Sequence, residues 1–488
     1  MSRLFFSMLA VAGLAAAAAA EERRESFNRD PGWEGVNNRA RKLKPRTIRQ
    51  DFGYSPKTEY AGGKPGEVGG TITAAAEPAY YAKKLAARSF ADRLKASGKV
   101  FCKGRRFHTL IGFFNAGTLN EWRTPNTIAL RLAGRGDTVF VYVEYATGRW
   151  RAGGDSPRPF PTARDPRTGR RRLKGFPAGK AYEWSLEYDP KGNDGKGAVT
   201  ARFGGETAVC NLQPGHRDDG ASFNRFGLLT VMKHAAHPGE VWLDDVAVNG
   251  EKEEFGKDPG WEGRNNRRSY ETTDVRPRFD FGFSPTNHAG GKGKGELGGL
   301  VFRGDCRFKE RMACYGDRLG ALTLAKPLRA SGKVCLRRGV SDSTTLLGFY
   351  HSKDSMAVTE SQAHGIPRCF LGVAVEGPSR EGFLFYPLYR VDGDGSASAV
   401  RKRPPYILPD GRPHAWALEY DPAAAGGRGR ITVTLDGKRV ALDLGKGHRA
   451  AGARFDRFGL VTTWIDGNGQ KVYFDDLTYT ASQEDGAR

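Results

Sequence analysis

The sequence lacks most features that would place it outside the ordinary globular proteins. After its first twenty residues it has no apolar run long enough to cross a bilayer, and its six cysteines show no zinc or redox spacing. It also lacks the Gly-x-Ser-x-Gly, phosphate-loop and His-Glu-x-x-His motifs. With 39% apolar and 11% aromatic residues, these absences exclude a coiled coil, a multi-span membrane protein, a disulfide-stapled miniprotein and a disordered chain.

What the sequence has in quantity is positive charge, glycine and proline. Its 77 Lys and Arg residues exceed its 55 Asp and Glu residues, which gives a net charge of +22 over 488 residues. The 65 glycines and 26 prolines favour many short strands and turns over helical bundles. The length suggests two or three domains, each able to bury its own core.

The N-terminus has the pattern of a secretory signal peptide. Arg3 precedes an uncharged, alanine-rich run that ends at Ala20, and Glu21-Glu22-Arg23-Arg24 follows directly. This pattern predicts a signal peptide over residues 1–20, cleaved near Ala20. An uncleaved anchor is the alternative, but the run is short and weakly apolar for a span. We therefore expect a secreted protein, extracellular or periplasmic, with no membrane span after signal removal.

The chain contains one domain twice. Residues 25–39 and residues 253–267 are identical at eleven of fifteen positions, including the motif Asp-Pro-Gly-Trp-Glu-Gly. The motifs Gly-Glu-x-Gly-Gly, Ser-Gly-Lys-Val and Trp-x-Leu-Glu-Tyr-Asp-Pro recur in the same order in both halves. A repeat of this length is a duplicated domain and not a solenoid unit. The polar stretch 249–252 predicts a division into residues 21–250 and residues 251–488.

The cysteines do not follow this repeat. When the halves are aligned on Ser-Gly-Lys-Val, Cys335 stands opposite Phe101, and Cys102 stands opposite Leu336. A shift of one residue along a strand turns the side chain to the other face, so the halves share no bridge. Isolated bridges such as Cys102–Cys210 remain open, and burial as small hydrophobic side chains is the alternative.

Period-two patterns predict an all-β fold. Trp184, Leu186 and Tyr188 share one face of a strand, and the same pattern recurs at Trp416, Leu418 and Tyr420. Many short strands with glycine-rich turns indicate a β-sandwich or jelly roll in each repeat. A short helix is expected only around Ala79–Lys95 and Phe308–Leu319.

The terminal motifs Leu-Asp-Asp-Val and Phe-Asp-Asp-Leu, the opening Phe-x-x-Asp-Pro-Gly-Trp-Glu-Gly and the repeat length resemble those of the concanavalin A-like lectin/glucanase superfamily, which includes laminin-G-like domains. The resemblance covers both repeats and implies two tandem jelly-roll β-sandwiches that contact a glycan on a concave sheet. Because a fold does not define an activity, the resemblance names no function by itself.

The resemblance also implies a structural calcium ion. One aspartate of each pair, Asp245 or Asp476, could join a calcium shell with oxygens from the opening segment, such as those of Glu25 or Glu253. The alternative is that each aspartate caps a turn or pairs with a basic residue. The glutamate of each Gly-Glu-x-Gly-Gly motif is interpreted as a solvated charge at a tight strand bend.

The sequence does not assign a catalytic residue. Retaining glucanases need two carboxylates about 5 Å apart, but Glu187-Tyr188-Asp189 and Glu419-Tyr420-Asp421 both run into proline and a turn. His216 and His448 recur, as the histidines of alginate lyases of this superfamily would, but each follows a glycine and is expected to anchor its loop. Whether the chain is an enzyme therefore stays open.

Ligand contact is expected on the strands of the first repeat. Aromatic side chains there could stack on sugar rings while charged ones bond to hydroxyl groups. The residues that we expect to face a ligand are Asn115, Trp122, Arg131 and Glu144.

Two basic runs, one within residues 151–174 and one at Arg401-Lys402-Arg403, indicate solvated loops that would also attract uronate or sulfate groups. No nucleic-acid recognition motif is present. The leading hypothesis is a secreted, non-catalytic protein that binds polysaccharide, anionic polysaccharide in particular. The alternatives are a glycoside hydrolase or polysaccharide lyase of this fold, and a structural envelope or matrix protein.

Overall fold

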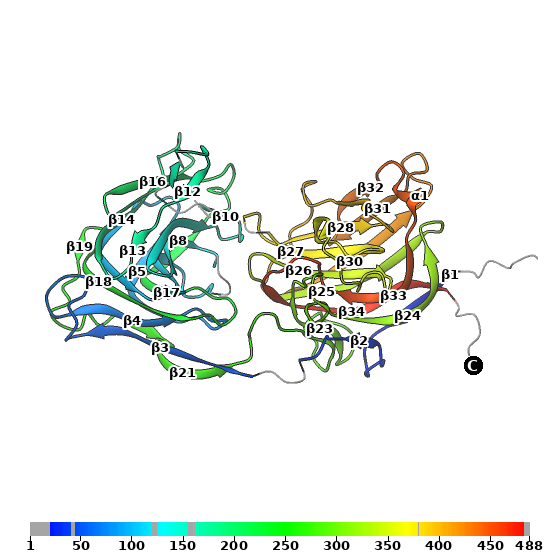
Figure 1. Ribbon diagram of the computed structural model, residues 1–488, viewed down its shortest axis with the longest axis horizontal. Helices are drawn as coiled ribbons and strands as arrows, with labels where there is room; N and C mark the ends of the chain where they lie inside the picture. The colour runs from blue at the N-terminus through cyan, green and yellow to red at the C-terminus, as the bar shows by residue number, and fades with distance from the viewer. Residues whose placement is uncertain are drawn as a thin grey trace, which may run out of the picture.

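The protein folds as two β-sandwich lobes that lie side by side (Figure 1). The computed structural model describes residues 20–40, 44–119, 124–154, 160, 162–164, 166–378 and 380–482. In this part of the chain, helix is limited to two 3-10 turns, Lys309–Arg311 and Ala363–Gly365, and the short helix α1 (His448–Ala451). The expected all-β class with two tandem jelly-roll sandwiches is confirmed. No helix in the described ranges has the length and apolar character needed to cross a membrane. The predicted signal peptide, residues 1–20, lies outside them except for Ala20.

The first lobe packs a back sheet against a front sheet. The back sheet has the order β16 (Glu206–Asn211), β15 (Ala198–Phe203), β14 (Ala181–Asp189), β6 (Leu94–Lys103), β18 (Pro238–Val248), β4 (Glu67–Thr73), β3 (Arg46–Ser55), β21 (Arg267–Thr272), with β19 (Glu251–Lys252) on β18. The front sheet has the order β10 (Ala152–Gly154), β9 (Thr138–Ala146), β8 (Thr127–Arg135), β7 (His108–Phe114), β17 (Ser222–Thr230), β5 (Tyr80–Ser89), β20 (Glu262–Arg264), with β13 (Phe176–Pro177) on β9. A small hairpin joins β11 (Thr162–Arg164) to β12 (Arg171–Leu173).

The second lobe repeats this arrangement. Its back sheet has the order β22 (Asp280–Ser284), β23 (Glu296–Phe302), β34 (Gly469–Ser482), β25 (Leu328–Arg338), β30 (Pro413–Asp421), β31 (Arg430–Leu435), β32 (Lys438–Asp443), with β1 (Ala20–Glu25) on β34. Its front sheet has the order β2 (Glu34–Val36), β24 (Cys314–Thr323), β33 (Arg454–Val461), β26 (Ser343–Tyr350), β27 (Phe370–Gly377), β28 (Leu384–Arg390), β29 (Ser396–Ser398).

The apolar side chains that alternate along the strands, as the sequence predicts, fill the space between the sheets. Trp184, Leu186 and Tyr188 are buried in the first core, and their counterparts on β30 are buried in the second. The helix expected around Ala79–Lys95 is wrong, because strand β5 occupies most of that segment. Of the segment Phe308–Leu319, only Lys309–Arg311 is helical, as a 3-10 turn, and β24 begins at Cys314. Alanine and lysine favour a helix locally in the first of these segments, but Tyr81 packs into the sandwich core, and pairing with β17 overrides the local preference.

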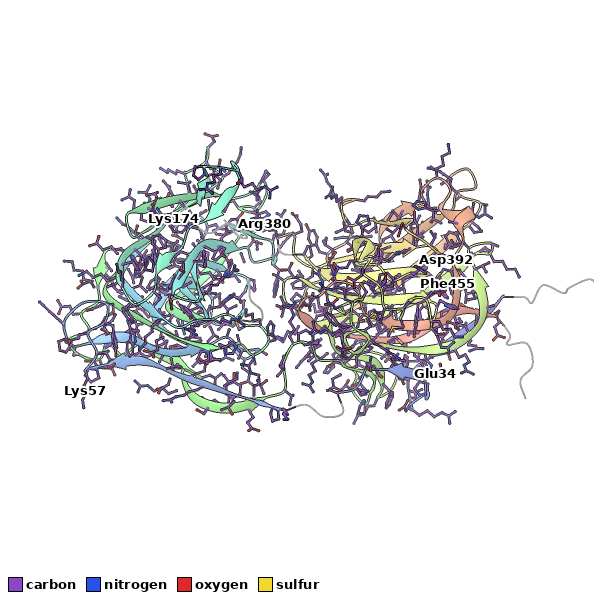
Figure 2. All side chains as sticks on the ribbon, viewed as in Figure 1. Glu34, Lys57, Lys174, Arg380, Asp392 and Phe455 are labelled. Carbon is purple, nitrogen blue, oxygen red and sulfur yellow. The ribbon has the colours of Figure 1, made fainter. Side chains whose placement is uncertain are left out.

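The opening segment of each repeat docks on the lobe built mainly from the other repeat. We call residues 20–39 the N-terminal arm and residues 251–272 the middle arm. The N-terminal arm pairs through β1 with β34 and through β2 with β24, and its Glu34 lies on the second lobe (Figures 1 and 2). The middle arm pairs through β19, β20 and β21 with strands of the first lobe. Strand pairing therefore divides the chain differently from the expected boundary at residue 250, because each arm pairs with the lobe built mainly from the other repeat.

The recurring Asn-Asn-Arg motif holds each arm in place. Asn38 donates a hydrogen bond from Nδ2 to the Phe281 carbonyl at 2.7 Å, and Asn266 donates in the same way to Phe52 at 2.6 Å. The tryptophan of each arm, Trp33 or Trp261, is less than a tenth exposed and inserts into the lobe on which the arm docks. The motif is therefore a docking device for a sheet edge.

The six cysteines are all buried, and none forms a disulfide. Burial raises the pKa of the Cys314 thiol to about 11 and that of Cys369 to about 11, which keeps both thiols protonated at neutral pH. The interpretation of the cysteines as buried hydrophobic side chains is confirmed.

The arm exchange predicts that each arm tryptophan stabilises the lobe of the other repeat. Trp33→Ala should destabilise the second lobe by about 3 kcal/mol, as expected when a large aromatic ring is deleted from a core. Hydrogen–deuterium exchange should then rise in β24 and β34. Trp261→Ala is the matched variant, and it should raise exchange in β5 and β18. Faster exchange of the first lobe in Trp33→Ala would contradict the exchange of arms.

Candidate functional site

Two of the expected ligand residues form a buried ion pair. Arg131 on β8 donates from Nε to Glu144 Oε1 on β9 at 2.6 Å, and both side chains are about 5% exposed. The guanidinium also lies 3.9 Å from the centre of the Tyr142 ring. The pair sits on the outer face of the front sheet, and its two charges are held together within the protein.

Another expected ligand residue, Asn115, lies in the turn that follows β7. Asn115 shapes this turn, in which its side-chain oxygen accepts the Gly117 N–H at 2.9 Å and its carbonyl accepts the Thr118 N–H at 3.2 Å. Trp122 lies outside the described residues. Much of the basic run 151–174 also lies outside them, and Arg401, Lys402 and Arg403 are exposed, as predicted for a solvated loop.

The recurring histidines anchor loops, as predicted. His216 Nδ1 lies 3.0 Å from the Tyr145 hydroxyl, which also accepts the Gln213 N–H. Burial lowers the pKa of His216 to about 4. In the second lobe, His448 makes the same contact with Tyr389 at 2.7 Å. These imidazoles hold the loop against the sheet and face no cleft.

The four carboxylates proposed for calcium do not fit a calcium shell. Asp245 and Asp476 pair with equivalent lysines, Lys99 at 2.7 Å and Lys333 at 2.9 Å. Glu25 accepts the Phe27 N–H at 2.7 Å, and Glu253 accepts from Trp261 Nε1 at 3.0 Å. No group of three or more possible His, Cys, Asp or Glu ligands gathers in the described ranges. Calcium binding stays an untested prediction, and nothing below depends on it.

The glutamates of the Gly-Glu-x-Gly-Gly motifs are buried, so the expectation of a solvated charge is wrong. Glu67 and Glu296 are both 0% exposed. Glu296 accepts the N–H groups of His288 at 2.9 Å and Ala289 at 2.7 Å, which ties down the loop that precedes it. Asp475, the first aspartate of its pair, is also 0% exposed, and its Oδ2 has no hydrogen-bond partner in the described part of the chain. Burial, with the charges of Asp476 and Glu296 as smaller causes, raises the pKa of Asp475 to about 7.

The strongest candidate site is a basic cavity between the lobes, which we call the interlobe cavity. It encloses about 530 Å³. The first lobe contributes the start of β3, the start of β7, the end of β8 and the loop 233–237, while the second contributes residues 275–277, Arg311 and Asp466. Among the described residues that line it, one carboxylate faces a cluster of basic side chains: Arg46, Arg106, His108, Arg135, Lys233, His234, His237, Arg276 and Arg311.

The two lobes meet at this cavity and above it. At the cavity, the Ala235 N–H of the first lobe donates to the Asp274 carbonyl at 2.9 Å. Arg276 binds the single carboxylate, Asp466, at 2.7 Å within the second lobe, and Arg46 donates to the Ala235 carbonyl at 3.2 Å within the first. Higher on the interface, Arg380 of the second lobe donates to the Gly154 carbonyl at 3.0 Å, and its carbonyl accepts the Ala152 N–H (Figure 2). Because both lobes contribute walls, the cavity exists only in the assembled tandem.

The basic groups at the cavity disfavour one another's charge. Burial, with the charges of Arg131 and Arg276 as smaller causes, lowers the pKa of Lys233 to about 8. The ammonium lies 3.3 Å from His108 Nδ1, whose pKa is also lowered by burial and by Lys233. Burial and Lys233 likewise lower the pKa of His234 to about 3. An anion in the cavity would favour the charged form of Lys233 and so raise its pKa again.

A second basic hollow continues from the cavity along the first lobe. It encloses about 660 Å³ and shares Arg106 and His237 with the interlobe cavity. Arg105 and Asp137 also line it. The two hollows form a path longer than a single small ion requires.

Sequence reasoning missed this site because its residues come from scattered segments. Only Arg105-Arg106 and Lys233-His234 are adjacent in sequence, and neither forms a charge run. One usable signal was the comparison of the repeats, since Lys233-His234 stands where the second repeat has Ile465-Asp466. That difference marks a basic loop particular to the first repeat.

Comparisons with known proteins find similar structures but no matching family. No protein-family model matches the sequence, and no curated protein matches it. The structure is similar to the LG4-5 domains of the mouse laminin α1 chain, with 11% identity over 98% of this chain and 100% of that one, at a TM-score of 0.20. It is also similar to the carbohydrate recognition domain of Emp47p, with 9% identity over 42% of this chain and 89% of that one, at a TM-score of 0.26. A third similar structure is a botulinum neurotoxin DC binding domain in complex with SialylT, with 5% identity over 90% and 94% and a TM-score of 0.22.

The TM-scores are low, so the fold assignment rests on the strand pairing described above. No argument about function is drawn from these structures.

The buried Asp475 predicts a pH-dependent stability. Its pKa is about 7 in the folded chain, whereas the unfolded chain loses this proton near pH 4. The free energy of unfolding should therefore fall as pH rises from about 4 to about 7 and then level off. Asp475→Asn removes this cost, so its Tm should exceed that of the wild type by several degrees at pH 8 but not at pH 4, since each kcal/mol is worth roughly 2–4 °C.

Asp244→Asn is the matched control in the first lobe. Burial also raises the pKa of Asp244, but that carboxyl is partly exposed, so a smaller gain is expected. Equal stabilisation of Asp475→Asn at pH 4 and pH 8, measured by scanning calorimetry, would show that the carboxyl is not protonated in the folded protein.

Proposed function

We propose that this is a secreted, non-catalytic protein that binds an acidic polysaccharide in the interlobe cavity. The observation that carries the proposal is the concentration of basic side chains around one carboxylate in a cavity of about 530 Å³. The predicted signal peptide supports the location, and the resemblance of the sequence to lectin-like jelly rolls supports the class of ligand.

The electrostatics favour carboxylate or sulfate groups. Arginine binds both through paired N–H donors, and Arg46, Arg106 and Arg135 reach the cavity from three different segments of the first lobe. The net charge of +22 would further attract an acidic polymer over a long range at low ionic strength. A polymer also fits the path of two connected hollows better than an isolated ion does.

The described carboxylates do not form a hydrolase pair at this site. Asp466 is bound by Arg276, and Glu296 is sealed beneath the loop that it ties down. Glu187 and Asp189 both lie at the surface beside Arg93. Acid–base cleavage of a glycosidic bond needs two carboxyl groups across the bond, and this arrangement does not supply them.

One observation favours a lyase as the second candidate. Lys233 lies beside His108 in the cavity, and with a pKa of about 8 part of it is neutral and able to accept a proton near neutral pH. Arginine side chains around it would neutralise a uronate carboxylate. Formation of unsaturated uronates from polygalacturonate or alginate, followed by ultraviolet absorbance, would establish this alternative in place of simple binding.

The binding proposal is tested by calorimetric titration with heparin, polygalacturonate and neutral dextran. The acidic polymers should bind at low salt and at least tenfold more weakly at high salt, because binding releases counterions, while dextran should not compete for the cavity. Inorganic sulfate separates recognition of a polymer from recognition of a free ion. Sulfate binding without polymer binding would contradict the proposal.

The cavity is tested by Arg106→Ala/Arg135→Ala, whose side chains are exposed and not needed for folding. This variant should bind the acidic polymers at least tenfold more weakly. Lys191→Ala/Lys196→Ala, in the exposed hairpin between β14 and β15, removes the same charge elsewhere and should keep most of the affinity. Equal losses in the two variants would show that net charge, and not the cavity, attracts the polymer.

Lys233 predicts a pH dependence of binding. Its charged form binds the anion, and its pKa is about 8 in the free protein. Affinity should therefore fall between pH 7 and pH 9, well below the range in which an ordinary lysine loses its proton. Lys233→Met should weaken binding at pH 7 and flatten this profile. A wild-type profile that stays flat to pH 9 would exclude Lys233 from the site.

A further inference from the structure

An exposed aromatic cluster lies on the outer face of the back sheet of the first lobe. The Tyr60 ring stacks on Phe101 at 5.1 Å and 25°, and it lies 5.6 Å from the Trp242 ring. Phe101 on β6 and Trp242 on β18 are direct cross-strand partners. Their neighbours along both strands, such as Val100 and Leu243, point into the core, so the cluster lies on the outer face, where Phe101 and Trp242 are half-buried. Tyr60 is 47% exposed.

A groove lies beside the cluster because two glycines leave space on the sheet. Trp242 pairs with Gly69 on β4, and Gly69 pairs with Gly53 on β3. A Cβ at Gly69 would lie 2.8 Å from the Trp242 ring, so the indole can lie on the sheet only because this residue is glycine. The resulting hollow encloses about 310 Å³ and has the tryptophan in its wall.

Groups that form hydrogen bonds surround this hollow. Arg267 of the middle arm lines it and donates to the Tyr54 carbonyl at 2.8 Å. Asp51 and Glu240 also line it, and each carboxylate contacts one basic side chain, Arg49 at 2.7 Å and Lys103 at 3.9 Å. Two carboxylates and one guanidinium line this hollow, whereas in the interlobe cavity a single carboxylate faces many basic side chains.

The second lobe carries a reduced copy of the groove. Tyr473 stands in the place of Trp242 and pairs with Gly298, which pairs with Gly282. His288 packs against Tyr473 with ring centres 4.6 Å apart and ring planes tilted by 58°. At the other two positions, Cys335 replaces Phe101 and Lys471 replaces Glu240. Both lobes therefore have an aromatic side chain beside a pair of glycines on adjacent strands. The cluster of three aromatic side chains occurs in the first lobe.

We propose that the hollow beside Trp242, together with the adjoining Tyr60 and Phe101 rings, is a second carbohydrate site, which stacks the rings of a neutral sugar chain. The C–H face of a pyranose ring packs on an aromatic face, as other apolar groups do. Carboxylate and guanidinium groups at the edge accept from and donate to the ring hydroxyls. A neutral ring suits the mixed charges of this edge, whereas an acidic sugar would approach Asp51 and Glu240.

This site goes beyond the proposed function, and separate residues carry it. Trp242 is four residues along β18 from Pro238, which lines the second basic hollow. The strand rise places the two about 13 Å apart. A polysaccharide that contains both neutral and acidic sugars could therefore reach both sites with sugars that are only a few units apart.

The test is titration with the neutral hexasaccharides of cellulose, xylan, mannan and laminarin, followed by calorimetry and tryptophan fluorescence. At least one should bind to the full chain, with a change in fluorescence from Trp242. Tyr60→Ala and Trp242→Ala should weaken that binding about tenfold, the upper end for one aromatic contact, and Trp242→Phe should restore part of it. Tyr60 is exposed, so its variant keeps the fold.

Tyr406→Ala is the matched control, since Tyr406 on the second lobe is also 47% exposed. It should bind as the wild type does. The proposal is overturned if no hexasaccharide binds, or if Tyr60→Ala and Tyr406→Ala lose affinity equally. The Arg106→Ala/Arg135→Ala variant should bind the hexasaccharide normally, so loss of the acidic-polymer site and loss of this groove give different results.

Discussion

The structure depends on the antiparallel pairing of each arm with the lobe of the other repeat. β1 and β2 cover edges of the second lobe, and β19, β20 and β21 cover edges of the first. An exposed strand edge invites pairing with another chain, so exchange protects both lobes with segments that the repeat already supplies. It also ties the lobes together by two crossings of the chain.

That tie allows like charges to gather at the boundary of the lobes. The charge of Arg276 helps to lower the pKa of Lys233, and the basic side chains in the described cavity wall outnumber its single carboxylate, Asp466. Such a cluster would separate two lobes joined only by a flexible linker. The backbone pairing of the arms, the Asn38 and Asn266 side chains and the Arg380 contact supply the opposing force. An acidic ligand would then bind to a site already assembled.

Local pattern explains much of the fold and little of the site. The strand with Trp184, Leu186 and Tyr188, the loop anchor His216 and the burial of the cysteines all follow from side-chain period and burial, which neighbouring residues determine. Arg131 and Glu144 were expected to face a ligand, but their contact with each other follows from cross-strand register, which the sequence pattern does not contain. Glu67 was expected to be solvated but is buried, because the loop that contains Gly62 folds over its carboxylate.

The amino-acid sequence by itself determined that one sandwich domain occurs twice, since alternation and repeated motifs are properties of neighbouring residues. Only the tertiary structure decided which lobe each arm completes, because two arms with nearly the same residues fit either edge and the path of the chain selects between them. It also decided where the charges meet. Electrostatic interaction depends on distance in space, and Arg46, Arg135 and Arg311 come close only after both lobes have folded.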